Sequence, residues 1–242
     1  RLTNTFTRSG SEHTVTRAAH IRTQPHATPP LTSYEYYHNT IMNIDIKANK
    51  DEFLELLRST KRDGVEDVIT DLENLGFFSA PASAGHHLNV EGGLAALAVW
   101  EAMKPLEPSL QTEVSRDSLI IASLLHDVCK ADIYVRSVKK RRNVLGQWED
   151  TEGYKVSYKE FPMGHGEKSV IQLLCSGLDM TDAEMLAIRW HMGAWGINMN
   201  SYEDQRCYDT ARALYPLVSI VQTADGLAAS IMERTAEDAD NA

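Results

Sequence analysis

Cysteine is scarce in this sequence and is not spaced for cross-linking or for a zinc ribbon. The chain contains Cys129, Cys175 and Cys207, an odd number with no CxxC pair. Disulfide frameworks and ribbon-type zinc sites need paired cysteines, so this pattern argues against both. We interpret the three side chains as reduced thiols.

Long apolar runs and positive charge are also lacking. No run approaches the ~18 to 20 residues of a membrane span, and no charged-then-apolar leader is present. We therefore expect a cytoplasmic protein with no membrane partner. The 24 Lys and Arg residues are outnumbered by 34 Asp and Glu residues, for a formal charge of −10. This charge argues against a general affinity for long nucleic-acid duplexes.

The first 41 residues differ in composition from the rest of the chain. Residues 1–41 are rich in Thr, Arg, His and Pro and show no apolar periodicity, whereas Met42 opens a helical pattern. They carry four arginines and two glutamates, so the remaining residues carry a formal charge of −12. We expect an irregular or disordered leader at 1–41 and a single domain at 42–242.

Apolar periodicity and stop signals indicate that helices dominate the second segment. The predicted helices cover about 50–60, 63–76, 91–104, 117–129, 165–177, 181–193 and 210–232. Thr181 and Glu184 have the spacing of a capping box, and Pro216 marks either a bend or a first helical turn. Short segments with Tyr, Val and Trp around "EDTEG" predict a hairpin or structured loop. The expected fold is all-α, with a small β-hairpin insertion.

Five histidines outside the leader lie at or near ends of predicted helices, and two aspartates accompany them. The histidines are His86, His87, His126, His165 and His191. Asp127 adjoins one of them in "LIIASLLHDVCK", and Asp225 lies in the apolar run "LVSIVQTADGLAASI". Buried carboxylates need a cation or hydrogen bonds, so a divalent metal site is one interpretation. In the other interpretation, the histidines compensate helix dipoles and Asp225 is held by hydrogen bonds.

Four ordered elements resemble the HD superfamily of metal-dependent phosphohydrolases. They are "SLLHDVCK", "FPMGHGEKS", "IRWHMG" and "VQTADGLAA", and together they place His126, Asp127, His165, His191 and Asp225 in the order of that family. The segment "GHHLNVEGGL" is similar to a sub-group that includes a bacterial 3′-to-5′ exoribonuclease. The resemblance covers about residues 76–232 and implies an HD-type helical bundle.

The resemblance also implies roles for these residues. Asp127 would bridge two metals, with His126 and Asp225 on the first and His165 and His191 on the second. Imidazole and carboxylate ligands suit Mn, Fe, Co, Ni or Zn better than Mg, and we expect one or two such ions. Two ions would activate a water for attack on a phosphoester. Lys130 lies about 300° round a helix from Asp127 and is expected to contact a substrate phosphate.

The first ligand of the family pattern is missing. Where the family has a His in a G-G-L-x-x-His-Ser-Leu run, this chain has Leu97 in "EGGLAALAVW". Either the sequence lacks two residues, or the first metal has one ligand fewer, or His87 replaces the missing one. His86 and His87 are otherwise expected to bind substrate in the pocket. We expect a continuous helix through Leu97 and better occupancy at His165 and His191 than at the first position.

Two functional hypotheses follow. The first is a phosphohydrolase that acts on a nucleotide or a short single-stranded oligonucleotide end. The second is a catalytically weak nucleotide-binding or regulatory protein, which the missing His favours. The "KKRR" run at 139–142 is either a solvated face or a rim that holds phosphate.

Overall fold

A computed structural model describes residues 45–85, 88–104, 114–143 and 145–233. All of them belong to the second of two compact units, residues 31–242. The predicted leader at 1–41 and the predicted pocket residues His86 and His87 lie outside the described residues.

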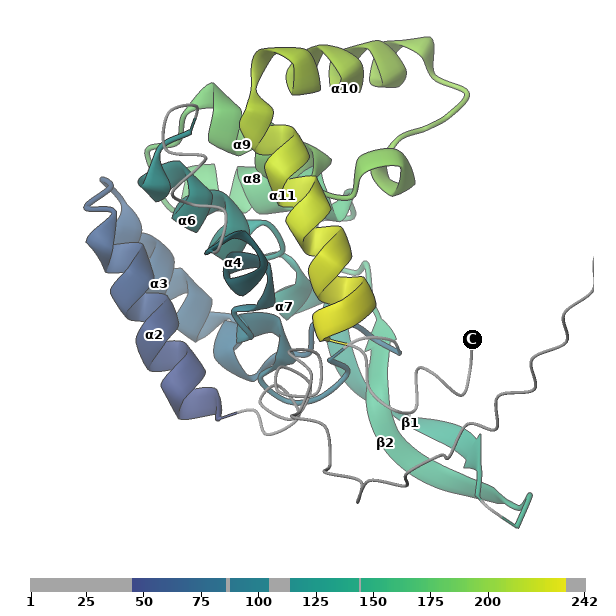
Figure 1. Ribbon diagram of the computed structural model, residues 1–242. Coiled ribbons are helices and arrows are strands. Elements are labelled where there is room, and N and C mark those ends of the chain that lie inside the picture. Colours follow the sequence, from purple (N-terminus) through teal and green to yellow (C-terminus); the bar gives the residue numbers. More distant parts are fainter. Residues whose placement is uncertain (1–44, 86–87, 105–113, 144, 234–242) are drawn as a thin grey trace, which may run out of the picture. The chain divides into compact units, whose positions relative to one another are not determined.

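The described part is mostly helical, with one two-stranded sheet, as the composition and periodicity predict (Figure 1). The helices are α2 Ile46–Ser59, α3 Val65–Asn74, α4 Ala98–Met103, α6 Arg116–Leu125, α7 Lys130–Ile133, α8 His165–Cys175, α9 Asp182–Trp190, α10 Tyr202–Leu214 and α11 Pro216–Leu227. Short 3-10 turns are η1 Phe77–Ser79, η2 Gly93–Ala95 and η4 Gly193–Gly196, and a π-helical turn, η5, covers Ala228–Met232. The strands are β1 Tyr134–Arg142 and β2 Trp148–Val156.

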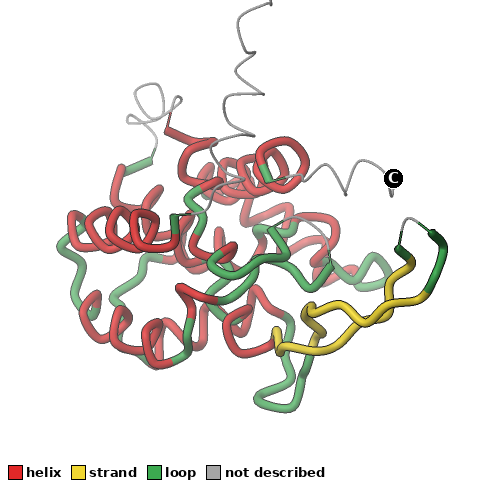
Figure 2. The backbone as a smooth tube through the Cα atoms, turned by 90° about the horizontal axis from the view of Figure 1, so that it is seen from below, coloured by secondary structure: helices red, strands yellow, loops and turns green. Residues whose placement is uncertain are grey.

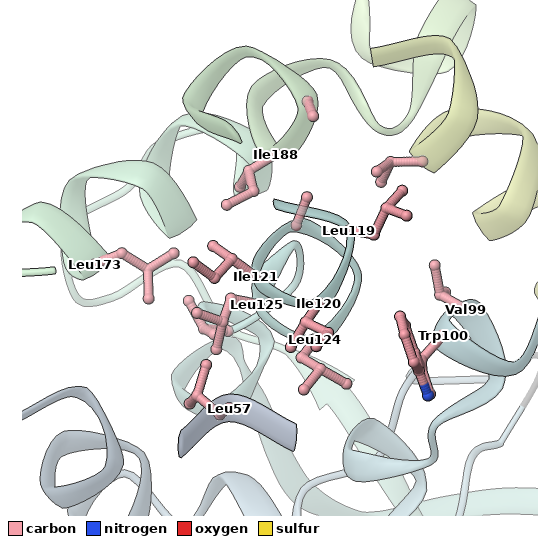
Figure 3. Packing of buried hydrophobic residues seen from close by; sticks show 14 of the residues in the cluster. Leu57, Val99, Trp100, Leu119, Ile120, Ile121, Leu124, Leu125, Leu173 and Ile188 are labelled. Carbon is pink, nitrogen blue, oxygen red and sulfur yellow. The ribbon is translucent and has the colours of Figure 1, made fainter. Parts of the chain in front are cut away.

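The centre of the core is α6, which is apolar on nearly every face. All residues from Ser118 to Leu125 are buried. Figure 3 shows side chains of α6 pointing in several directions toward residues of other helices, among them Leu57, Trp100 and Ile188. A helix that is apolar all round is stable only when neighbours cover all its sides. The apolar composition of α6 on all sides thus matches its central position.

The two strands form an antiparallel hairpin directly after α7. Tyr134 pairs with Val156 at its base and Arg142 with Trp148 near its tip. Figure 2 shows the hairpin leading away from the helices, and most of its side chains are at least partly exposed. This is the insertion that the Tyr, Val and Trp pattern predicts.

Several helix boundaries agree with the stop signals in the sequence. Gly76 and Gly177 adopt positive φ values of 72° and 82° just after α3 and α8, where a left-handed residue ends a helix. Thr181 accepts a hydrogen bond from the Glu184 backbone N–H, and Glu184 accepts one from the Thr181 backbone N–H. The capping box is thus confirmed.

Two of the expected long helices differ in the structure. The helix predicted for 91–104 is interrupted at Ala96, whose ψ of 131° is extended, so that α4 begins only after Leu97. The segment 210–232 is divided between α10 and α11, with a 104° bend between α10 and the segment 216–232. Pro216 lies in the first turn of α11, which is one of the two alternatives that the sequence leaves open. Proline favours a first turn because it has no N–H to donate.

The helix predicted for 117–129 also ends early. Helix α6 stops at Leu125. The residues that follow form turns closed by hydrogen bonds between residues three apart, such as the bond of 2.9 Å from the Lys130 N–H to the Asp127 carbonyl. His126 and Asp127 therefore lie in a tight turn rather than within a helix.

No single helix among the described residues is long and apolar enough to cross a membrane, although the bent pair 202–214 and 216–232 passes that test jointly, by length and composition only.

A buried ion pair joins the loop after α2 to α6 and α9. Nη1 and Nη2 of Arg62 each donate a hydrogen bond of 2.9 Å to the carboxylate of Glu184, whose side chain is fully buried. The same carboxylate accepts hydrogen bonds from the Ser118 hydroxyl and from the Thr181 backbone. A buried charge with this many partners holds α9 in a defined position against α6.

We predict that Glu184→Gln lowers the free energy of unfolding by about 3 kcal/mol, because the change leaves the Arg62 charge without its carboxylate in a largely buried position. Urea unfolding followed by circular dichroism measures this. Glu66→Gln is the matched control, since Glu66 pairs with Arg58 on the exposed surface. Equal losses for the two variants would contradict the central role of the buried pair.

Candidate metal centre

The structure brings together all five residues that the sequence proposes as metal ligands, and each comes from a helix end or the turn beyond it. His126 and Asp127 follow α6, His165 is the first residue of α8, His191 follows α9, and Asp225 lies near the end of α11. Helix ends leave side chains free to converge without interrupting the packed helical faces.

Asp127 occupies the middle of this group. Its Oδ1 atom lies 3.3 Å from Nε2 of His191 and 3.9 Å from Nε2 of His165. Its Oδ2 atom lies 3.1 Å from Nε2 of His126, and Oδ1 of Asp225 lies 3.8 Å from the same nitrogen. Each oxygen of Asp127 thus faces a different pair of side chains. The two sides of this carboxylate therefore face different imidazoles.

Backbone carbonyls orient two of the imidazoles. Nδ1 of His126 lies 2.8 Å from the Ser123 carbonyl, and Nδ1 of His191 lies 2.7 Å from the Ile188 carbonyl. A carbonyl oxygen only accepts hydrogen bonds, so Nδ1 carries the proton in both rings. Nε2 is then the nitrogen directed at Asp127, as in most histidine metal ligands.

The charges in the group influence one another strongly. Burial alone would raise the pKa of Asp127, but the positive charges of Lys130 and His126 hold it well below its usual range. Burial alone would lower the pKa of His126, but the charges of Asp127 and Asp225 raise it to about 9. In the absence of a metal, a proton on His126 therefore supplies positive charge beside these carboxylates.

His165 and Glu233 are shifted by burial in ways that suppress their charges. Burial lowers the pKa of His165 to about 4, so this imidazole is neutral at pH 7. Burial, followed by the negative charge of Asp225, raises the pKa of Glu233 to about 7.

The residues fit a divalent transition metal. Among the buried side-chain atoms of the described residues, Oδ1 of Asp127 and Nε2 of His165 and His191 have no hydrogen-bond partner. Such atoms are costly to bury unless a cation or another group satisfies them. His126, Asp127 and His191 each offer one ligand atom, and the three atoms lie within 4.8 Å of one another. Nitrogen and oxygen donors in this mixture suit Mn, Fe, Co, Ni or Zn.

Lys130 lies closer to Asp127 than the helical projection suggests. Its Nζ atom is 2.6 Å from Oδ2 of Asp127, and the residue is buried. Burial alone would lower the pKa of Lys130, but the charge of Asp127 raises it above its ordinary value. Lys130 also lines the cavity at the centre. That it contacts a substrate phosphate stays a prediction.

A small cavity adjoins the cluster. It has a volume of about 30 Å³, and its walls include Leu97, His126, Asp127, Asp225 and Glu233. This is room for about one or two water molecules or ions. Leu97 therefore faces the centre, as expected for the position of the missing His, although it does so from the residue before a helix and not from within a continuous one.

The "KKRR" run is largely matched by opposite charge and by local contacts. Lys139 donates a hydrogen bond to the Ala84 carbonyl. Lys140 and Arg141 pair in register with Asp150 and Glu149 on β2, with 3.8 Å between Lys140 and Asp150. These contacts favour the interpretation as a solvated, charge-balanced face over a phosphate-holding rim.

Glu233 is the residue of the cavity wall that the sequence-based prediction missed. The signal was present, because Glu233 follows Asp225 by eight residues at the end of the same apolar segment. Its burial could not be foreseen, since it depends on the π-helical turn η5 that precedes it.

Comparison of the chain with protein-family models, with curated proteins and with solved structures finds no match.

We predict that the purified protein binds a first-row transition metal, because buried imidazole and carboxylate atoms here lack other partners. Elemental analysis should detect the metal, and adding Mn²⁺ to chelator-treated protein should raise the melting temperature through ligand linkage. Mg²⁺ at the same concentration is the control and should raise it less. Absence of bound metal together with an unchanged melting temperature would rule out the site.

Metal affinity should rise with pH. His126 has a pKa of about 9 without metal, so it must release a proton to become a ligand at neutral pH. Between about pH 6 and pH 8, each pH unit should strengthen Mn²⁺ binding by up to about tenfold. Calorimetry in buffers of different ionisation enthalpy should detect proton release. Affinity independent of pH in this range would contradict the assignment of His126.

Proposed function

We propose that this chain is a metal-dependent phosphohydrolase of the HD type, acting on a phosphoester of a nucleotide or of a short single-stranded oligonucleotide end. The motif order in the sequence suggests the family. The convergence of His126, Asp127, His165, His191 and Asp225 in one centre supports the proposal.

The position of Asp127 is the observation that carries the proposal. One carboxylate oxygen lies near Nε2 of His126, which Asp225 also approaches, and the other lies near His165 and His191. Imidazoles on both sides of one carboxylate suit two metal positions better than a single one. Two divalent ions, when bound, lower the pKa of a water nucleophile and stabilise charge on phosphoryl oxygens.

The chain's own residues have separate tasks in this proposal. Asp127 would help to hold both ions, while the Ser123 and Ile188 carbonyls keep the His126 and His191 rings in place. Lys130 offsets part of the carboxylate charge and is the nearby cation proposed to receive a substrate phosphate. Manganese or iron is the proposed metal, because both accept mixed nitrogen and oxygen ligands.

The small cavity and the acidic chain favour a small substrate. The cavity of about 30 Å³ holds ions or water and cannot enclose a nucleotide. Only the phosphoester group would therefore approach the centre. The formal charge of −10 opposes binding of long polyanions, which leaves nucleotides and short single-stranded ends as the proposed substrates.

Asp127→Asn is expected to lower manganese-dependent turnover of bis-p-nitrophenyl phosphate by about 100-fold or more, because an amide does not replace a bridging carboxylate. Asp150→Asn on the exposed hairpin is the matched control and should keep full turnover. Circular dichroism checks that each variant remains helical.

His165→Gln provides a second variant in case Asp127→Asn fails to fold, since His165 is partly exposed. It should also reduce turnover strongly. Near-normal turnover in either folded variant would refute the two-metal assignment. A panel of nucleotides and short oligonucleotides then identifies the substrate.

Leu97 favours a second candidate function. Leu97 is an apolar residue in the cavity wall, at the position where the HD superfamily has a histidine metal ligand. A catalytically weak nucleotide-binding or regulatory protein would bind metal and nucleotide but show no metal-dependent turnover. Parallel binding and turnover measurements on the wild-type protein discriminate between the two functions.

A further inference from the structure

Glu233 is a buried carboxylate beside the candidate metal centre. It is 8% exposed and lines the same cavity as His126, Asp127 and Asp225. The element that carries it, η5, continues directly from α11, which carries Asp225. The two carboxylates are therefore positioned by one continuous segment of chain.

The π-helical turn accounts for the position of Glu233. In a regular α-helix, a residue eight positions after Asp225 would lie about 80° away around the axis. Here the Glu233 backbone N–H donates to the Ala228 carbonyl at 2.9 Å, a bond that spans five residues instead of four. The wider turn takes up one extra residue, so Glu233 returns to within about 20° of the Asp225 direction. Such turns occur frequently at functional sites.

The cavity wall brings carboxylates and basic side chains together. Asp127, Asp225 and Glu233 line it together with Lys130, and Lys130 is 2.6 Å from Asp127. The side chains of Asp127 and Asp225 are 8% and 22% exposed, so solvent screens them poorly. Among these three carboxylates, Oδ1 of Asp127 is a buried oxygen without a hydrogen-bond partner, which a divalent cation in the cavity would satisfy.

The first metal position, near these carboxylates, lacks one of the ligands that the family pattern gives it. The motif comparison gives the first metal position His126, Asp225 and the shared Asp127, but Leu97 replaces the remaining His. Leu97 and Glu233 lie in the wall of the same cavity. Glu233 thus offers an oxygen donor to the position where an imidazole donor is missing.

We propose that Glu233 is an additional carboxylate for the first metal position and compensates for the ligand lost at Leu97. This inference rests on the proposed function, because it takes the metal centre as given. With Glu233 as a ligand, the first metal position is no longer expected to bind metal more weakly than the position at His165 and His191.

The test is a Mn²⁺ titration of wild-type protein, Glu233→Gln and the control Glu203→Gln, without substrate. Glu203 lies exposed on α10. Calorimetry and the spin-resonance signal of free Mn²⁺ give the affinity of each site. Glu233→Gln should weaken one manganese site by about tenfold or more and leave the other site unchanged, whereas the control should match the wild type.

Melting of the metal-free proteins at alkaline pH separates ligation from a structural role. The melting temperature of metal-free Glu233→Gln measures what this carboxylate contributes to the fold without a metal. Its rise on adding Mn²⁺ should be smaller. A lower metal-free melting temperature combined with wild-type manganese affinity would show a structural role and overturn the inference.

Glu233→Asp decides the matter if Glu233→Gln does not fold. It keeps the charge but withdraws the carboxylate by one methylene, so one manganese site should weaken, and unchanged affinity would overturn the inference. A wild-type protein that binds no Mn²⁺ would overturn the proposed function as well. Tight binding by both wild type and Glu233→Gln would overturn only the role of Glu233.

Discussion

The structure around the candidate centre depends on one buried negative charge, the carboxylate of Asp127. A carboxylate in this position is stable only if cations and hydrogen-bond donors surround it. Lys130 meets part of this need, and three imidazole nitrogens lie within 4 Å of its oxygens. The turns after α6 and α9 and the start of α8 must therefore all converge on this point.

The core provides that convergence through rigid packing. Helix α6 is buried on all sides, so the turn that follows it has a defined position (Figure 3). The Arg62–Glu184 pair fixes the start of α9 against α6, and His191 follows the other end of α9. Carbonyls of the preceding helical turns then orient His126 and His191. The apolar core and the polar centre are thus parts of one arrangement.

Local signals predicted a large share of this structure and missed its long-range parts. The hairpin, the capping box at Thr181 and the glycine stops after α3 and α8 all depend on a few adjacent residues. The break at Ala96 was missed because the apolar spacing around it is compatible with a helix. The separation of α10 from α11 was left open because Pro216 is compatible with either a bend or a first turn.

The sequence by itself determined the helical class, the apolar central helix and the candidate ligand residues, because periodicity and residue chemistry are local properties. Only the tertiary structure decided that Asp127 directs each oxygen to a different pair of side chains, that Lys130 contacts Asp127, and that "KKRR" is opposed by β2. It also decided that Glu233 reaches the cavity through a π-helical turn. These features depend on how distant segments pack, and no short pattern in the sequence encodes that packing.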